Sequence, residues 1–231
     1  MRIPEKWRQF FHRESFEELK KKLDPKEFYP DKENLFKCFE YFNPGNTRAV
    51  FLFLSPYGKN WASGLAAAVP DREHLNPTLE MMLECISKDE NMDKEDVLNN
   101  FDYTLEHWAK QGVLLLNCSL TVPKGGPADG HVDIWKPFMS YFIKSFAETY
   151  TGIPWVFFGK KPQFYSELVP ISTHSKFNVC HPAATVYAKQ NGEVPHNLDF
   201  PNSRTFGWVN DITQFLNDDQ IQWTLPMEEK K

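Results

Sequence analysis

The chain has 231 residues, of which 41% are hydrophobic, 15% aromatic and 25% charged, and this composition excludes an intrinsically disordered protein. The formal net charge of −5 counts against an extended basic face that would coat nucleic acid without specificity, although it leaves room for a local basic surface. No apolar run reaches the roughly 18 to 20 residues that a membrane helix needs. The N-terminal residues MRIPEKWRQF are charged where a signal peptide would be apolar. We therefore expect a cytoplasmic protein that is not secreted.

Apolar runs of strand length alternate with helical patterns along the chain. In chain order we expect a helix at 4–22, a strand at 49–54, helices at 79–87 and 101–111, a strand at 113–117, a helix at 135–150, strands at 155–158 and 177–180, and a helix at 209–217. This alternation is typical of an α/β fold in which a central, mostly parallel four-stranded sheet is covered by helices on both faces. The length needs one hydrophobic core, so we expect one domain over 1–231, with an N-terminal helix within 1–24 and a flexible tail at 225–231.

Each predicted strand is followed by a loop of polar or small residues. The loops are Ser55–Gly58, Asn117–Ser119, Gly159–Lys161 and His181–Ala184. Ligands of open α/β sheets bind outside the carboxyl ends of the strands, so these four loops are expected to converge on one cleft.

The cysteines give no sign of a metal site. Cys38, Cys85, Cys118 and Cys180 form no Cys-x-x-Cys pair, and we interpret them as reduced thiols. We expect no metal and no cofactor.

Several motifs, in order and spacing, resemble the family 1 uracil-DNA glycosylases over most of the chain. Phe53-Leu54-Ser55-Pro56-Tyr57-Gly58 stands where that family has its water-activating loop, usually Gly-Gln-Asp-Pro-Tyr-His, and HLNPTLEMMLECI resembles its phosphate-binding loop and helix. HWAKQGVLLLNCSLTV, GHVDIW, FFGKKPQ, HPAATVY and SRTFGWVND follow in family order. The resemblance implies a three-layer α/β/α glycosylase that extrudes a base from DNA before cutting its N-glycosidic bond.

The resemblance also implies roles for individual residues. Asn117 would hydrogen-bond the edge of a pyrimidine through its amide, His181 would stabilise negative charge on the departing base, and Tyr57 would form a wall against the pyrimidine ring. Val186 and Tyr187 are the candidates for a wedge that enters the duplex. The other expected DNA contacts are Thr78, Lys160, Lys161, Thr185 and Arg204.

Three departures from the family pattern lie in the expected active site. Ser55 replaces the carboxylate of the first loop, Gly58 replaces the following histidine, and Ala67 replaces the aromatic residue that stacks on uracil. The segment between Tyr57 and Gly64 is also one residue shorter than usual. Replacing an aromatic ring by Ala removes on the order of 100 Å² or more of side-chain surface, so the pocket should accept a larger base.

The missing carboxylate leaves two alternatives for the chemistry. A serine can position a water molecule but cannot accept its proton, so general-base assistance worth roughly 10² to 10⁴ in rate is absent or relocated. Either the site has lost catalysis, or another side chain places the water, for instance Asn60, Asp71 or Asp133, while His181 and the DNA phosphates stabilise the cationic sugar. We favour the second alternative because Tyr57, Asn117 and His181 are all retained.

The sequence thus predicts a monomeric, monofunctional DNA glycosylase for a pyrimidine larger than uracil, such as hydroxymethylated or glucosylated cytosine or uracil of viral DNA, and a role in defence against phage. The position of Tyr57 conflicts with this, because in the family that ring excludes bulk at pyrimidine C5, unless the shortened loop shifts it. The rival hypotheses are ordinary uracil excision in repair, a catalytically silent DNA-binding protein, and a protein-binding surface on an inert fold.

Overall fold

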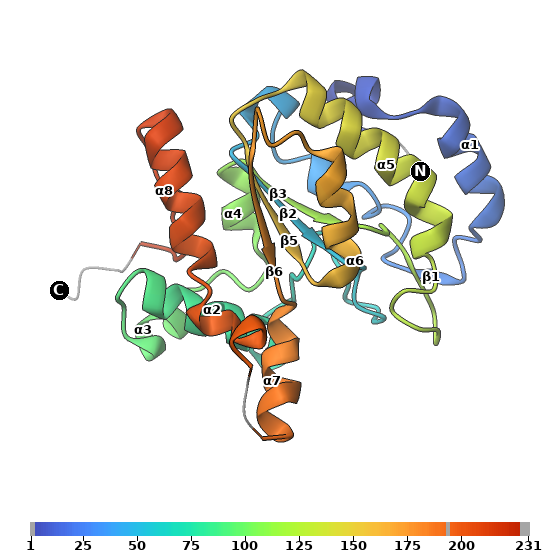
Figure 1. Ribbon diagram of the computed structural model, residues 1–231. Coiled ribbons are helices and arrows are strands. Elements are labelled where there is room, and N and C mark those ends of the chain that lie inside the picture. The colour runs from blue at the N-terminus through green and yellow to red at the C-terminus, as the bar shows by residue number, and fades with distance from the viewer. Residues whose placement is uncertain (1–2, 193–194, 227–231) are drawn as a thin grey trace.

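Four parallel strands form the centre of the structure (Figure 1). The computed structural model describes residues 3–192 and 195–226. The strands are β2 (Ala49–Phe53), β3 (Val113–Asn117), β5 (Pro154–Phe158) and β6 (Ser175–Val179), in the order β3-β2-β5-β6. Their first three members are buried at every position, as near-continuous apolar runs in a doubly covered sheet should be. The predicted strands and their parallel arrangement are therefore confirmed.

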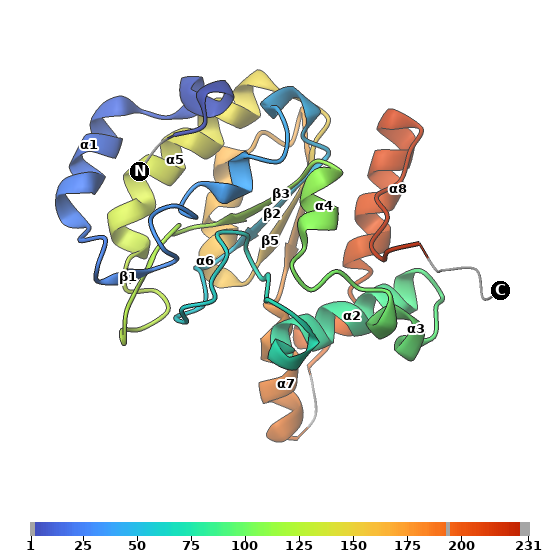
Figure 2. The ribbon, with the colours of Figure 1, turned by 180° about the vertical axis from the view of Figure 1, so that it is seen from behind.

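Helices cover both faces of the sheet, as Figures 1 and 2 show from opposite sides. On one face lie η1 (Glu5–Phe10), α1 (Arg13–Lys22) and α5 (Val132–Thr149), where Trp155 of β5 packs against Phe146. On the other lie α4 (Glu106–Lys110) and α8 (Thr205–Asn217), where Phe51 of β2 packs against Phe206. The predicted three-layer α/β/α class is confirmed.

The remaining helices include three that gather at the carboxyl ends of the strands. These are α2 (Pro77–Asp89), α3 (Lys94–Asn99) and α7 (Pro182–Gln190) (Figure 1). The short elements are β1 (Phe28–Tyr29), which pairs antiparallel with β4 (Val122–Pro123), α6 (Lys160–Gln163), and the 3₁₀ turns η2 (Lys37–Phe39), η3 (Pro44–Asn46), η4 (Arg72–His74), η5 (Phe164–Leu168), η6 (His196–Leu198) and η7 (Phe200–Asn202).

Two predicted helices differ from the observed ones for local reasons. The helix expected at 4–22 is divided into η1 and α1, because Phe11 is extended and His12 caps α1 by accepting the N–H of Ser15. In the helix expected at 101–111 only α4 is helical. The Asp102 carboxylate accepts the N–H groups of Thr104 (3.0 Å) and His107 (2.7 Å), and so holds the preceding residues in a turn.

The segment HPAATVY was expected to be a loop, but Pro182 begins α7. Proline at the first position of a helix loses no intrahelical hydrogen bond, so the sequence is compatible with this start.

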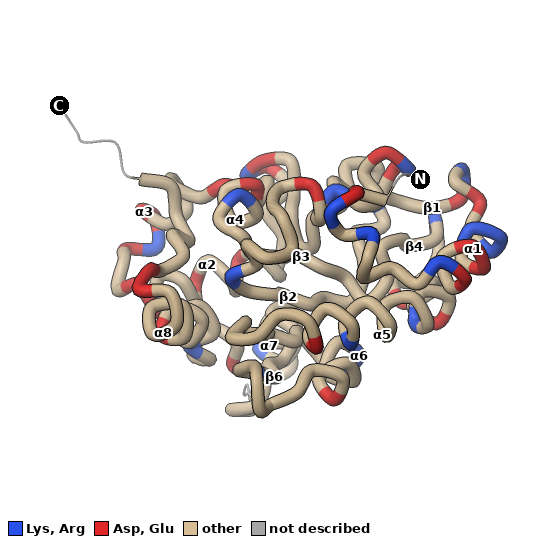
Figure 3. Tube along the Cα trace, turned by 90° about the horizontal axis from the view of Figure 1, so that it is seen from above, with Lys and Arg blue, Asp and Glu red and all other residues tan. Residues whose placement is uncertain are grey.

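Of the tail expected at 225–231, residues 227–231 lie outside the described part of the chain. Among the described helices, none combines the length and apolar character needed to cross a bilayer. Basic and acidic residues are mixed along the trace seen from above (Figure 3).

Candidate active site

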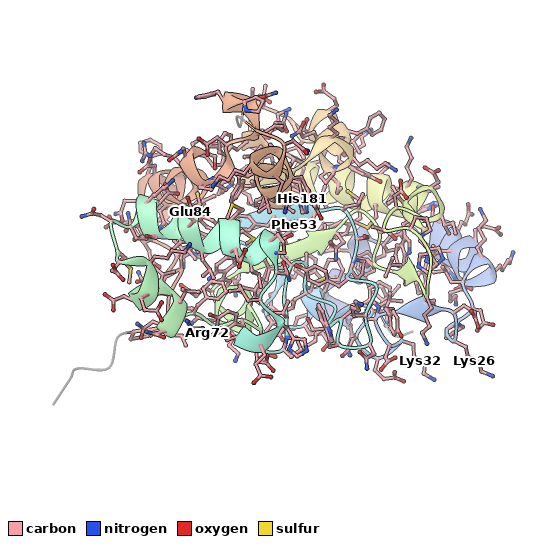
Figure 4. All side chains as sticks on the ribbon, turned by 90° about the horizontal axis from the view of Figure 1, so that it is seen from below. Lys26, Lys32, Phe53, Arg72, Glu84 and His181 are labelled. Carbon is pink, nitrogen blue, oxygen red and sulfur yellow. The ribbon has the colours of Figure 1, made fainter. Side chains whose placement is uncertain are left out.

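A cavity of about 500 Å³ opens at the carboxyl ends of β2 and β6. The cavity is lined by seven of the residues singled out from the sequence, namely Ser55, Tyr57, Gly58, Ala67, Thr78, His181 and, from α7, Tyr187. Phe53 and His181 lie close together in this region (Figure 4). The expected convergence of the loop after β2 with the loop after β6 is thus observed.

His181 is the N-cap residue of α7, and this fixes the state of its ring. Its Nδ1 accepts the backbone N–H of Ala183 at 3.2 Å, so the neutral imidazole carries its proton on Nε2. Burial lowers the pKa of His181 below 6.5, because desolvation disfavours the imidazolium form. The site therefore presents a neutral N–H donor at the first turn of a helix, where the helix dipole also favours negative charge.

Gly159 makes room for this histidine. It has a φ of +93°, a conformation that favours glycine, and a Cβ placed on it would lie 3.3 Å from Cβ of His181. The backbone N–H of Gly159 donates to the carbonyl of Val179, so the chain after β5 lies directly against the chain after β6.

Tyr57 contacts Asn76 and Trp61, two residues that the sequence did not single out, as well as Ala67. Its hydroxyl lies 3.3 Å from Oδ1 of Asn76 and 3.4 Å from the carbonyl oxygen of Ala67. The ring of Trp61 packs against it at a centroid distance of 5.1 Å. Burial raises the pKa of Tyr57, so the phenol stays protonated. The motif Asn76-Pro77, an N-cap residue followed by a first-turn proline, was a sequence signal for the helix start that places Asn76 here.

The small residues of the cavity leave space beside Tyr57. A methyl group placed on Gly58 would meet no heavy atom within 4 Å beyond its chain neighbours. Ala67 is 7% exposed and has a φ of +64°. Gly58 is exposed, Ala67 is buried, and both line the cavity.

Asn117 does not line this cavity, although it was expected to contact the base. The residue is 3% exposed, and its Oδ1 has no hydrogen-bond partner among the described residues. Asn117 is paired in register with Phe53, which does line the cavity. The retained amide is thus present at the predicted strand end but is shielded from the open space.

The three residues considered as substitutes for the missing carboxylate lie elsewhere. Asn60 is exposed and lines a separate cavity of about 370 Å³. Asp71 caps η4 and lies 2.8 Å from the Nδ1 of His74. Asp133 is exposed on α5. None of them lines the cavity beside His181, so the expected catalytic role of Asn60 has no support in this geometry.

The expected DNA-binding lysines differ in their surroundings. Lys160 lines a neighbouring cavity of about 480 Å³ that shares His181 and Ala184 with the first, and within the described residues it forms no ion pair. Lys161 pairs with Asp129 at 2.5 Å.

The remaining residues that were expected to contact DNA differ in their exposure and in their partners. Tyr187 is 61% exposed at the cavity, and Val186 packs partly buried against the core. Thr185, which was expected to contact DNA, is fully buried, and its hydroxyl donates to the carbonyl of Leu198 and accepts the N–H of Phe200. Arg204 precedes α8 and pairs with Asp211, at the far end of α2 from Thr78.

Comparisons with known proteins place this geometry in a family. No family profile matches the chain. A uracil-DNA glycosylase of Mesomycoplasma hyopneumoniae (strain 7448) is 31% identical over 227 residues, which cover 94% of this chain and 96% of that protein. The crystal structure of mimivirus uracil-DNA glycosylase matches with a TM-score of 0.74 at 20% identity, over 95% of this chain and 89% of that one. The wild-type UNG of Nitratifractor salsuginis matches with a TM-score of 0.60 at 16% identity, over 91% and 92% of the two chains. The likeness to these solved structures shows the fold, and the identity to the mycoplasma protein over nearly the whole length of both chains shows that this chain belongs to the uracil-DNA glycosylases, which are DNA glycosylases and hydrolases.

Proposed function

We propose that the protein is a monofunctional DNA glycosylase that extrudes a pyrimidine larger than uracil from DNA and hydrolyses its N-glycosidic bond to leave an abasic site. The candidate substrates are hydroxymethylated and glucosylated cytosine or uracil of viral DNA, and the corresponding biological role is defence against phage. The proposal includes a monomeric enzyme that acts in the cytoplasm on single- or double-stranded DNA.

The observation that supports the larger base is the free space beside Tyr57. Gly58 and Ala67 line a cavity of about 500 Å³, and no neighbouring group occupies the space next to Gly58. Tyr57 itself is fixed by Asn76 and Trp61. A substituent on the base would therefore extend past the Tyr57 ring toward Gly58 and Ala67.

The proposed chemistry uses His181 as a neutral donor. As the bond between the sugar C1′ and the base nitrogen breaks, the bonding electrons leave with the base, and the Nε2–H of His181 stabilises the resulting negative charge. Water then supplies its hydroxyl group to C1′, and its proton is released to the base or solvent. Ser55 can orient that water but cannot take up its proton, so the DNA phosphates must contribute more to stabilising the cationic sugar.

Ordinary uracil excision is the second candidate function. It is favoured by the name of the mycoplasma relative, a uracil-DNA glycosylase. A catalytically silent DNA-binding protein is the third, and it is favoured by Ser55 in place of a carboxylate.

A panel of DNA substrates separates the three candidates. The protein would be incubated with single- and double-stranded oligonucleotides that carry uracil, 5-hydroxymethyl pyrimidines or glucosylated pyrimidines, and alkali-sensitive cleavage would be scored. We expect cleavage of a substituted pyrimidine in preference to uracil. Cleavage of uracil alone would contradict the larger-base proposal, and DNA binding with no cleavage of any substrate would support the silent protein.

Ala67→Phe and Gly58→Phe test whether the space beside Tyr57 accommodates the substituent of the base, because each substitution would fill that space from one side. Each should reduce cleavage of the substituted base more than cleavage or binding of uracil-DNA. The comparison of the two variants is needed because a bulky residue at the positive φ of Ala67 is strained, whereas Gly58 has no such restriction.

A further inference from the structure

Phe53 stands between the two polar residues that the glycosylase site was expected to use together. The strand order places β2, which carries Phe53, between β3, which ends at Asn117, and the pair β5 and β6, after which His181 follows. Phe53 is the register partner of Asn117, and residues paired in register on parallel strands project from the same face of the sheet. Any group that contacted both Asn117 and His181 would have to pass the Phe53 side chain.

The Phe53 ring is held firmly in this position. It is stacked on the ring of Phe158, with centroids 4.1 Å apart and planes only 5° from parallel, and the ring of His181 lies edge-on at 6.3 Å. Phe53 is 3% exposed, yet it lines the cavity. The ring therefore forms the inner wall of the cavity and cannot rotate away without breaking its stack on Phe158.

Asn117 lies next to Phe53 in the sheet register and is itself buried. Its Oδ1 is buried without a hydrogen-bond partner among the described residues, a cost that native structures rarely leave uncompensated. The cavity, meanwhile, extends on the side of Tyr57, Gly58 and Ala67. The cavity therefore lies on the Tyr57 side of Phe53, and Asn117 is not part of its lining.

We propose that Phe53 is a specificity-determining residue that sets the inner limit of the base pocket. Its ring shields Asn117, so an extruded base is bound in the outer part of the cavity, between His181 and the Tyr57 side, without a hydrogen bond to Asn117. Unsubstituted uracil, which is too small to fill the outer part and cannot reach the amide, is bound poorly for this reason. This inference rests on the proposed function for its substrate class.

The test is a double-mutant cycle between Phe53 and Asn117, measured as the Kd for uracil-containing duplex DNA and as kcat/KM on the best substrate of the panel. Asn117→Ala alone should change kcat/KM on the substituted base by less than about threefold. Phe53→Gly should tighten uracil-DNA binding at least about tenfold, and the double variant should lose that gain. Extrusion can be followed separately by the fluorescence of 2-aminopurine placed next to the uracil.

Two controls test whether a change in DNA binding comes from a general loosening of core packing. Phe51→Leu changes an aromatic residue on the same strand and the same face that does not line the cavity, and it should leave uracil-DNA binding as in the wild type. If Phe53→Gly does not fold, as judged by circular dichroism and Tm, Phe53→Ala serves in the same cycle.

Two outcomes would show that Phe53 does not limit the base pocket. Loss of all cleavage in Asn117→Ala, or no gain of uracil-DNA binding in folded Phe53 variants, would overturn the inference. Because uracil-DNA binding needs no turnover, this arm still decides the role of Phe53 if the wild-type protein cleaves none of the substituted substrates and the proposed function fails.

Discussion

The Tyr57 hydroxyl lies 3.3 Å from Oδ1 of Asn76, the same oxygen that accepts the N–H groups of Thr78 and Leu79 at the start of α2. One side chain thus caps a helix and holds the aromatic wall of the cavity. The position of the wall is coupled to the end of α2 through this single amide.

Replacing Asn76 by Ala should therefore affect both stability and the site. Loss of the cap costs about 1 kcal/mol of unfolding free energy, with a range of roughly 0.5 to 2, and the freed Tyr57 ring should relax discrimination among substituted bases. Urea denaturation and the substrate panel measure the two effects. Tyr57→Phe is the control, because it keeps the ring and the cap while it removes the hydroxyl; if it reproduced the full stability loss of Asn76→Ala, the capping role would be refuted.

The lowered pKa of His181 predicts a pH dependence of folding stability. The unfolded chain takes up a proton at His181 near the ordinary value of 6.5, before the folded protein does. The free energy of unfolding should therefore fall as the pH decreases below about 6.5, until the folded-state pKa is passed. His181→Asn retains a good N-cap, so the difference in slope between wild type and this variant isolates the histidine. NMR titration of the ring checks the direction, and a folded-state pKa above 6.5 would contradict it.

Thr185 should contribute to stability and leave DNA affinity alone. Thr185→Val keeps the shape of the side chain but leaves the Phe200 N–H and the Leu198 carbonyl without their partner, at a cost of about 1 to 3 kcal/mol. Thr185→Ser, which retains the hydroxyl, should cost less. Chemical denaturation and DNA titration at fixed salt measure the two properties, and a variant that is stable but binds DNA weakly would restore the contact with DNA expected from the sequence.

The two neighbouring lysines should differ in their contribution to DNA binding. Lys160 lines the cavity next to His181 and has no carboxylate within 4 Å in the described structure, whereas Lys161 already pairs with Asp129. Each phosphate contact contributes about 0.9 to the slope of log K against log salt concentration for duplex DNA. Lys160→Ala should lower that slope by about this amount, and Lys161→Ala by less. Equal changes in the two variants would show that Asp129 does not compete for Lys161.

The strands were predictable because their burial leaves a simple pattern. Runs such as Val113–Leu116 are apolar at every position, as a sheet covered on both sides requires, and the loops after them indicated the edge at which a cavity forms. The helix start at Pro182 was not predicted, because a histidine followed by proline is as typical of a loop as of an N-cap followed by the first helical residue.

The site was only partly predictable for a different reason. Ser55, Tyr57, Gly58, Ala67 and His181 were singled out from the family motifs, and all line one cavity. Phe53 was assigned to the predicted strand and to the first position of the water-activating loop motif, but its place between Asn117 and His181 depends on the strand order. Contacts between strands far apart in the chain decide such a role.

The close approach of Gly159 to His181 makes the position of the His181 imidazole sensitive to substitution at a residue that has no functional group of its own. Adding one carbon there would press on the histidine Cβ from behind and would also strain a backbone with a φ of +93°. Random mutagenesis scored for lost base release should therefore recover changes at this glycine among well-folded, DNA-binding proteins, a class of inactive enzyme whose polar groups are all intact.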